Sequence, residues 1–542
     1  MIETYTSLHI HSEYSNGLLQ FTDSTIHISK ALQWCYDNGL RGMALSDHEG
    51  VSGFPEMEQA VSKMNVERPF QHIFANEIYL ISEEENELIH SETERPYYWH
   101  FLLIALDETG IRQLYELSSR AWLRSYMWHG LRRRPTFYSD IEEVIGNDKG
   151  HIVGSTACLG GRLPKHILAN EKQEAIDFVS WGKNIFGDDY FYLECQPCEE
   201  DNEEQIKVNR ALWKLHEQTN TSIIVTTDAH YMTIEDRKIH AAFLNSKDGG
   251  DTREADKFYR CAHLYTPQEL RKALYISSFN DEQIDEMFSN TNKITDRVQP
   301  ITLKKITQVP ALPEVPDYTI ENCYRQYYNE FPFVRHYAES KDPHEQYYFA
   351  QVEKGLKEQF EAHPEVDKYE YILQVNTEME QVKGLGEIFG NQRMSDYFTV
   401  VQKVIDLIWT EGDSLVGIGR GSAGAYLTNK LLGITGIDPM QPEIKDFYPW
   451  WLFCSIARSD SIFDIDIDIQ SFKKEKIIQA IKDYFGWRRV CQWVTWGRLS
   501  SKTAIERAAK GMGFSEDAVA YIKSLIPVKR GQIYSIKDCL YG

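Results

Sequence analysis

Short apolar runs that end in histidine, acid or cysteine recur through the first half of this 542-residue chain. Such runs are typical of strands, and the segments between them have the pattern of helices. Alternating strands and helices predict an α/β fold, and ligand-type side chains at strand ends predict a β/α barrel with a site at those ends. The six runs are TYTSLHIH, GLRGMALSDH, HIFANEIYL, HFLLIAL, HIVGSTACLG and TSIIVTTDAH.

Histidine is concentrated in the same half, since 14 of the 17 lie at or before His263. His9 and His11 are two residues apart and share one face of their strand, as do Asp228 and His230. Imidazole, carboxylate and thiol ligands from separate strands suit zinc or manganese better than magnesium alone. A lone histidine would more often be a core or surface residue, but several strand ends deliver ligand types here, which favours a metal site.

Two breaks divide the chain. In HLYTPQELRKAL, Thr266 can cap a helix, Pro267 can take the first helical position, and Glu269 can complete a capping box. The prolines of QVPALPEVPDY, residues 308–318, predict an extended connector. The first break predicts that a metal-binding domain over 1–265 ends there and that a second domain, which contains the connector, begins at 266.

A glycine-rich loop, residues 419–422, lies in SLVGIGRGSAGAYL between a predicted strand and a predicted helix. Loop amides and a helix N-terminus can hold phosphate oxygens, and Arg420 can add a charged fork. The glycines also match the dinucleotide pattern GxGxxG, but Asp438 comes too early for the acidic residue that this pattern expects. A plain structural turn is the other interpretation.

The stretch FDIDIDIQ, residues 463–470, alternates three aspartates with three isoleucines. On a strand, Asp464, Asp466 and Asp468 share one face, and such close like charges repel unless cations lie between them. A calcium loop is the competing interpretation, but Ile469 stands where that loop needs glycine, and β-branched residues favour a strand. Paired acids on a strand are what a two-metal phosphoryl-transfer site requires.

The net charge of −23 argues against a nucleic-acid partner, but the charge is unevenly distributed. Residues 471–542 hold 14 Lys+Arg against 6 Asp+Glu, a net charge of +8. A basic segment is expected where a protein faces phosphates, although a solvated helix face is the other interpretation. The nine scattered cysteines suit a reducing compartment. The absence of a signal sequence or an apolar run of about 18 residues predicts a cytoplasmic protein without a membrane partner.

Several segments of the first half resemble, in order and spacing, the PHP domain that begins the alpha subunit of bacterial DNA polymerase III. These segments are SLHIHSEYS, LSDHEG, FANEIYL, HFLLIAL, STACLGG and TTDAHY. The resemblance implies a distorted β/α barrel that binds up to three metals, zinc or manganese, and that hydrolyses phosphoesters in many members. Asn16 stands nearest to an aspartate of the family and would be a poorer ligand. The implied ligands are His9, His11, Asn16, His48, Glu77, His100, Cys158, Asp228 and His230.

Three later segments, GIGRGSAGAYL, GITGIDP and FDIDIDI, resemble the polymerase palm of the same subunit, which is similar to the beta-type nucleotidyltransferases. The resemblance implies that Asp466 and Asp468 are catalytic and hold Mg²⁺, with Asp464 beside them. The segment VTWGRLSSKTAIERAAKGMGF is similar to the start of the family's helical thumb, so the resemblance implies a palm over 266–497 and the start of a thumb over 498–542. The implied nucleotide-binding residues are Gly419, Arg420, Gly421, Ser422 and Lys502.

In the family a third catalytic carboxylate, the fingers and the clamp-binding segment lie further along than this chain extends. The resemblance therefore implies part of a split or truncated polymerase, bacterial or from a phage. We expect it to bind primed template DNA and deoxynucleoside triphosphates and to be completed by a second polypeptide. The alternatives are a PHP metal-dependent phosphoesterase or 3′–5′ exonuclease, and a catalytically silent scaffold.

Overall fold

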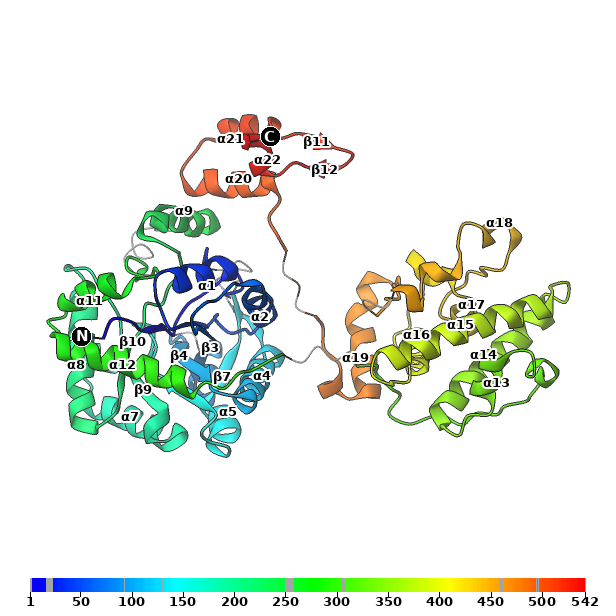
Figure 1. Ribbon diagram of the computed structural model, residues 1–542, viewed down its shortest axis with the longest axis horizontal. Helices are drawn as coiled ribbons and strands as arrows, with labels where there is room; N and C mark the ends of the chain where they lie inside the picture. The colour runs from blue at the N-terminus through cyan, green and yellow to red at the C-terminus, as the bar shows by residue number, and fades with distance from the viewer. Residues whose placement is uncertain are drawn as a thin grey trace. The chain divides into compact units, whose positions relative to one another are not determined.

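The computed structural model describes residues 2–15, 23–91, 93–128, 131–248, 258–303, 308–458, 462–493, 495 and 497–541. The chain forms two compact units, whose elements are labelled in Figure 1. The first unit is Met1–Leu303 with Trp496–Gly542, and the second is Lys304–Thr495. The first is α/β, as the sequence predicts, and the second is mainly helical.

The first unit is built on an eight-stranded sheet of order β1-β2-β3-β4-β8-β9-β10, with β7 beside β3. Neighbouring strands are parallel except β4, which is antiparallel to β3 and to β8. The sheet is curled. Ile10, just after the edge strand β1, and Ala229, just after the other edge strand β10, form a parallel bridge that brings the two edges together. The strands are β1 (Thr6–Ser7), β2 (Gly42–Leu45), β3 (Gln71–Ile81), β4 (Trp99–Ala105), β7 (Pro135–Phe137), β8 (Ile152–Ser155), β9 (Phe191–Cys195) and β10 (Ile223–Val225), and a separate hairpin pairs β5 (Tyr126–Trp128) with β6 (Leu131–Arg133).

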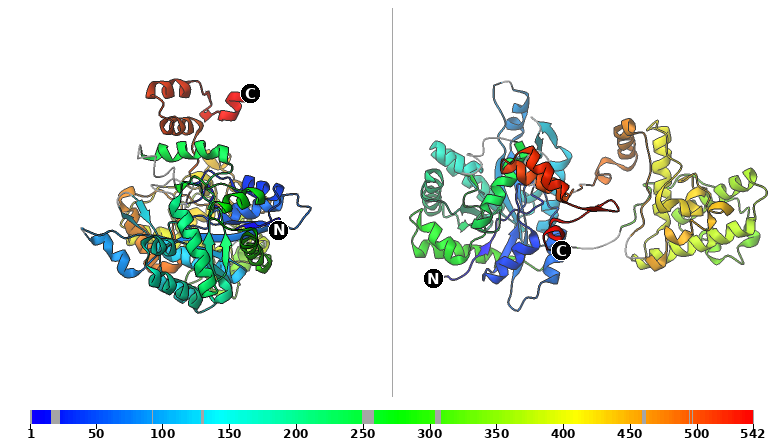
Figure 2. Two further views of the ribbon diagram at one scale, coloured as in Figure 1. Left: turned by 90° about the vertical axis from the view of Figure 1, so that its left-hand side faces the viewer. Right: turned by 90° about the horizontal axis from the view of Figure 1, so that it is seen from above.

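Helices surround this sheet (Figure 2). The contacts pair α1 with β2, α2 with β3, α4 with β4, α7 with β8 and α8 with β9. Their apolar faces are buried against the strands in one core, as expected for amphipathic helices. The helices of this part are α1 (Ile28–Asp37), α2 (Phe54–Lys63), α3 (Glu83–Glu87), α4 (Glu108–Leu123), α5 (Tyr138–Ile141), α6 (Arg162–Ala169), α7 (Lys172–Phe186), α8 (Glu203–Thr219) and α9 (Arg237–Asp248).

Two further helices, α11 (Pro267–Tyr275) and α12 (Asp281–Arg297), belong to the same unit. The predicted capping box is present, since Thr266 Oγ1 accepts from Glu269 N and the Glu269 carboxylate accepts from Thr266 N. Ile294 and Val298, on and just after α12, are buried with alternate strand residues in a second core cluster. For this reason the compact unit continues to residue 303, past the point near 265 where the sequence places the end of its first domain.

The C-terminal segment of the first unit contains α20 (Ser501–Gly511), α21 (Glu516–Ser524), α22 (Ile536–Tyr541) and a hairpin of β11 (Val528–Lys529) and β12 (Gln532–Ile533). Helix α20 packs against α9. A Cβ at Gly511 would lie 1.8 Å from the carbonyl oxygen of Ala242, so only glycine allows this approach.

The second unit has its own core, formed by aromatic and aliphatic side chains of α14, α15, α16 and α17. Its described residues contain no strand, and the predicted strand at 463–470 makes a single antiparallel bridge, between Ile469 and Val416. The aspartates of this stretch are exposed and the isoleucines half-buried, which is the alternation that the sequence predicts. The helices are α13 (Pro332–Ala338), α14 (Pro343–Ala362), α15 (Lys368–Ile388), α16 (Ser395–Thr410), α17 (Leu427–Leu431), α18 (Pro442–Lys445) and α19 (Lys474–Phe485).

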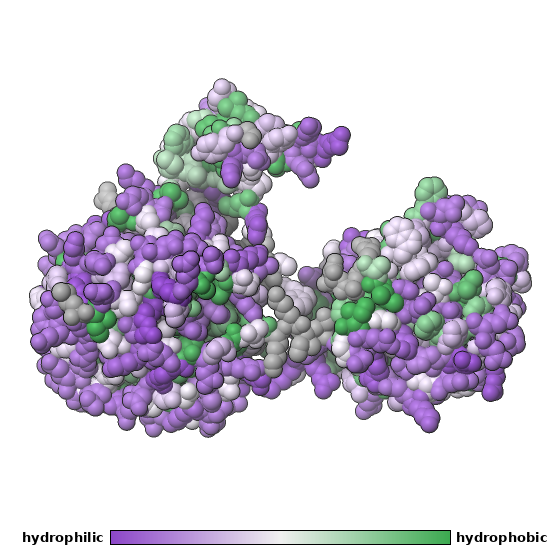
Figure 3. All heavy atoms as spheres, viewed as in Figure 1, coloured by the Kyte–Doolittle hydropathy of each residue, from purple (hydrophilic) through white to green (hydrophobic). Residues whose placement is uncertain are grey.

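Each of the six apolar runs contains a strand, so the prediction of an α/β unit with these strands is confirmed. The faces visible in Figure 3 are largely hydrophilic, with small hydrophobic areas. None of the described helices has the length and apolar character that a bilayer-crossing segment needs.

Candidate metal centre and glycine-rich loop

The structure brings eight of the predicted ligands together where the strands of the curled sheet end. Among the described residues, three groups of possible ligand atoms lie within 4.8 Å of one another. The groups share members, so they form one continuous cluster. They are His11, His48 and His230; His9, His11, Glu77 and Asp228; and His48, Glu77 and His100.

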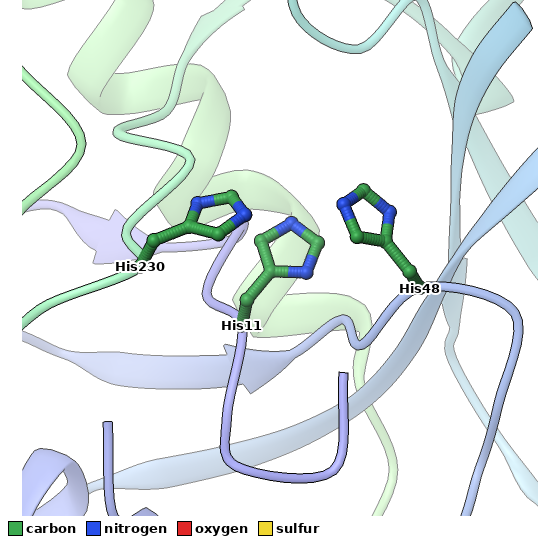
Figure 4. A group of neighbouring side chains, drawn as sticks. All are labelled: His11, His48 and His230. Carbon is green, nitrogen blue, oxygen red and sulfur yellow. The ribbon is translucent and has the colours of Figure 1, made fainter. Parts of the chain in front are cut away.

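Glu77 is common to two of these groups and is fully buried on β3. Its Oε1 lies 3.1 Å from His100 Nδ1, and its Oε2 lies 2.7 Å from His48 Nδ1. Asp228 Oδ1 lies 3.0 Å from His11 Nε2. Cys158 also belongs to the cluster, because its Sγ lies 3.4 Å from His100 Nδ1. Figure 4 shows the rings of His11, His48 and His230 side by side, each from a different segment of the chain.

The backbone at this cluster is strained. Glu49, Ala157 and Asp228 have φ values of 52°, 56° and 45°, in the left-handed region that favours glycine. Two of them are neighbours of His48 and Cys158 in the chain, and the third is itself a predicted ligand. Such strain collects where a site needs side chains in positions that regular strands do not provide.

The two buried carboxylates of the cluster keep their negative charge beside the imidazoles. Burial raises the pKa of Glu77, but His100, His48 and His9 hold it well below its usual range. Burial likewise opposes ionisation of Asp228, yet His9 and His230 lower its pKa. Both carboxylates are therefore charged, and both are buried.

Buried ligand atoms without a hydrogen-bond partner indicate whether metal ions fit here. Asp228 Oδ1, Glu77 Oε2 and His230 Nε2 are buried and form no hydrogen bond of good geometry. A buried polar atom without a partner is costly, and lone pairs that converge on one point are what metal coordination satisfies. The mixture of imidazole, carboxylate and thiol fits a cluster of metal ions.

Asp23 belongs to this cluster and was missed by the sequence interpretation. It is buried, its Oδ2 lies 3.1 Å from His48 Nε2 and 3.7 Å from His230 Nε2, and these two imidazoles hold its pKa well below the usual range despite burial. Asn16, which the sequence interpretation put in the place of the family's aspartate, lies outside the described residues. The polar run Asp23-Ser-Thr before α1 looks like an ordinary helix start, so no local signal identified Asp23.

Glu194 on β9 was also missed. Its Oε1 lies 2.8 Å from His9 Nδ1, and Ser155 Oγ donates to its Oε2 at 2.6 Å. An acceptor at Nδ1 fixes the tautomer of His9 and turns Nε2 toward the other ligands. The signal was available, because Glu194 is an acid inside the apolar run FYLEC, and a fully buried carboxylate is seldom found without a partner.

The glycine-rich loop and the aspartate pair lie together in the second unit, although about 45 residues separate them. Arg420 Nη2 lies 3.1 Å from Asp466 Oδ1, and Arg420 Nε lies 3.2 Å from Asp468 Oδ1. Gly421 has a φ of 63°, and a Cβ there would lie 3.3 Å from Asp466 Oδ2. Glycine therefore serves both the turn and the close approach to a carboxylate.

The segment after the loop differs from the prediction. Residues Gly421–Ala425, which include Ser422, form a 3₁₀ turn, and only then does α17 begin. The helix N-terminus therefore does not follow the loop directly. Lys502 lies on α20, in the other compact unit.

Two family models match this chain. The PHP domain matches residues 7–198, and the bacterial DNA polymerase III alpha NTPase domain matches residues 346–540. The chain resembles bacterial DNA polymerase III alpha in both of these parts. The first match covers strands β2 to β9 with most of the predicted ligands, and the second covers the glycine-rich loop and the aspartate pair.

Relatives match over nearly the whole of this chain. The chain is 33% identical over 558 residues to the DNA-directed DNA polymerase of Bacillus phage SPbeta, covering 98% of this chain and 42% of the relative. It is 26% identical over 568 residues to the DNA polymerase III subunit alpha of Thermus aquaticus, covering 99% and 44%. The subunit of Aquifex aeolicus matches at 25% over 539 residues, covering 97% and 41%. The chain thus spans about two fifths of the length of these curated relatives.

Proposed function

We propose that this chain carries part of the nucleotidyl-transfer site of a DNA-directed DNA polymerase. The observation that carries the proposal is the contact of Arg420 with both Asp466 and Asp468. A loop suited to phosphate and a pair of acids suited to metal are what transfer of a nucleotide to a primer 3′-hydroxyl requires. The match to the bacterial DNA polymerase III alpha NTPase domain supports the same reaction.

The aspartates would hold two magnesium ions. When bound, these ions would activate the 3′-hydroxyl and neutralise the leaving pyrophosphate. The fit is supported by the exposure of the carboxylates, 42% for Asp466 and 62% for Asp468, and by their convergence on one cation, the Arg420 guanidinium. Arg420 would exchange these carboxylates for phosphate oxygens, which it can contact as a planar fork. Gly419, Gly421 and Ser422 would line the triphosphate.

Primer extension tests this proposal. The 542-residue chain is assayed on primed template DNA with Mg²⁺ and four deoxynucleoside triphosphates, alone and with the remaining polymerase segment of a family member. We expect Asp466→Asn and Asp468→Asn to lower the rate by several orders of magnitude, because each removes a metal ligand. Asp464→Asn is the matched control, since Asp464 is exposed on the same face and has no contact with Arg420 among the interactions described. Equal extension by the wild type and Asp466→Asn would contradict the proposal.

A second candidate activity, phosphoester hydrolysis at the PHP centre, is favoured by Asp23. With Asp23 the cluster has a charged oxygen ligand beside His48 and His230, so it does not depend on Asn16. We propose zinc or manganese for this centre, because its ligands include imidazole and thiol. A bound metal would lower the pKa of a water molecule and so supply hydroxide near neutral pH.

Hydrolysis is tested with single-stranded DNA that carries a labelled 3′ end, in the presence of Mn²⁺ or Zn²⁺. We expect His9→Ala to abolish release of the label, and Asp466→Asn to leave it unchanged, because the aspartate pair belongs to the other unit. Release that persists in His9→Ala would exclude the PHP centre as its source.

A further inference from the structure

Glu378 is a fully buried carboxylate that the chemistry above does not use. It lies on α15 and accepts hydrogen bonds from the segment that follows the glycine-rich loop. Leu427 N donates to its Oε1 at 2.8 Å, and Thr428 N and Oγ1 donate to its Oε2 at 2.7 and 2.6 Å. Tyr426 OH donates to its backbone carbonyl at 3.0 Å. Three consecutive residues are therefore bound to one residue about 50 positions earlier in the chain.

The amides that Glu378 holds are the first two of helix α17. Such amides have no partner within their helix, so an acceptor at this place satisfies them. Because Glu378 occupies them, they are not available to a phosphate. The turn Gly421–Ala425 and Arg420 are then the groups left to meet one.

A chain of hydrogen bonds leads from this anchor back to the loop. Asn429, on the same short helix, donates from Nδ2 to the carbonyl of Ala423 at 2.9 Å. The backbone carbonyl of Asn429 accepts from Ile434 N at 2.8 Å. The position of the turn that carries Gly421 and Ser422 thus depends on α17, and the position of α17 depends on Glu378.

We propose that Glu378 is a positioning residue for the incoming nucleotide: it fixes the glycine-rich loop from the buried side, through α17 and Asn429. The inference rests on the proposed function, because it assumes that this loop binds the triphosphate. It adds a residue that touches neither the nucleotide nor the metals.

Glu378→Gln tests the proposal with little change of volume. The amide group must turn its NH₂ toward either Leu427 N or Thr428 N, so at least one of these amides loses its acceptor. Glu353→Gln is the matched control. Glu353 is also buried, on α14, and accepts from the backbone amides of Glu321, Asn322 and Cys323, which lie away from the loop in the sequence.

Two quantities are measured on the full chain: the affinity for a fluorescent deoxynucleoside triphosphate with Mg²⁺, and hydrogen exchange of residues 421–429. We expect Glu378→Gln to weaken binding about tenfold and to speed exchange of this segment. We expect Glu353→Gln to change neither, at a similar fall in melting temperature. Unchanged affinity and exchange in folded Glu378→Gln, or equal loss in both variants, would overturn the inference. Absence of nucleotide binding by the wild type would count against the proposed function instead, and the exchange result alone would then decide the role of Glu378.

Discussion

Asp23, which stands 12 positions after His11, adds a carboxylate to the candidate metal centre. Its carboxylate faces His48 and His230, and both imidazoles favour its charged form. We predict that Asp23→Asn weakens binding of at least one metal ion by 10-fold or more, by removal of a charged ligand. Metal content after dialysis against a graded chelator measures this. Asp37→Asn, at an exposed position on α1, is the control, and equal metal content in the two variants would remove Asp23 from the site.

The shifted pKa of His263 predicts how the stability of the fold depends on pH. Burial lowers its pKa to about 4, and its ring stacks on Tyr265 at 3.9 Å between centroids. The unfolded chain takes up this proton below pH 6.5, and the folded chain does so only near pH 4. Stability from this residue is therefore complete above pH 6.5 and falls as the pH decreases toward 4, by at most about 1.4 kcal/mol per pH unit.

We predict that His263→Phe flattens this part of the stability profile, since phenylalanine keeps the stacking and does not titrate. Melting temperatures between pH 7 and pH 5 measure the effect, which is about 2–4 °C per pH unit in the wild type. His90→Phe, at a side chain that is 75% exposed, should leave the slope unchanged. The same slope in His263→Phe as in the wild type would contradict the assignment.

Individual residues show what the sequence could and could not predict. The resemblance to the PHP domain identified the eight predicted ligands other than Asn16, and the pattern of strand ends by itself predicted only that such side chains meet at one edge of the sheet. Asp23 could not, because its distance from His11 along the chain says nothing about how the intervening segment returns it to the site. Glu194 could have been identified, since a charge inside an apolar strand needs a buried partner. The roles of all these residues stay predictions until the variants are measured.

At the scale of elements, α14 and α17 meet at a glycine. A Cβ at Gly355 would lie 2.2 Å from the carbonyl oxygen of Leu431, so the two helices approach as closely as they do only without a side chain there. We predict that Gly355→Ala destabilises the second unit by about 1–3 kcal/mol, although alanine normally favours a helix. Thermal unfolding measures this. Lys354→Ala, at a 68% exposed side chain one residue earlier, should stay within about 0.5 kcal/mol of the wild type, and equal effects would exclude close packing as the cause.

The elements were predicted unevenly. Apolar runs bounded by turns predicted six strands of the first unit. These strands are buried on both faces, so their sequences are largely apolar. The stretch 463–470 has the alternation of a strand, but a strand also needs a neighbouring strand. Among the described residues, this stretch forms a single bridge, between Ile469 and Val416. Periodicity in a sequence reports which face is buried, and it does not report which partners are present.

At the scale of the whole molecule, charge separates an acidic body from a basic C-terminal segment. The net charge of +8 over residues 471–542 predicts that binding of primed DNA weakens steeply as salt is added. We predict that Lys502→Ala lowers the slope of log affinity against log salt by about 1, because one phosphate contact is lost. Titrations at several salt concentrations measure the slope. Lys30→Ala on α1 is the control, and a slope unchanged by Lys502→Ala would mean that this lysine contacts no phosphate.

We propose that the glycine-rich loop and the aspartate pair are what this chain contributes to a polymerase, and Mg²⁺-dependent nucleotide binding tests that proposal most directly. The affinity of the 542-residue chain for a fluorescent deoxynucleoside triphosphate is measured with and without Mg²⁺. We predict tighter binding with Mg²⁺, a loss of that gain in Asp466→Asn and Asp468→Asn, and its retention in Asp464→Asn. Binding that is independent of Mg²⁺, or that is unchanged in Asp466→Asn, would contradict the assignment of this site.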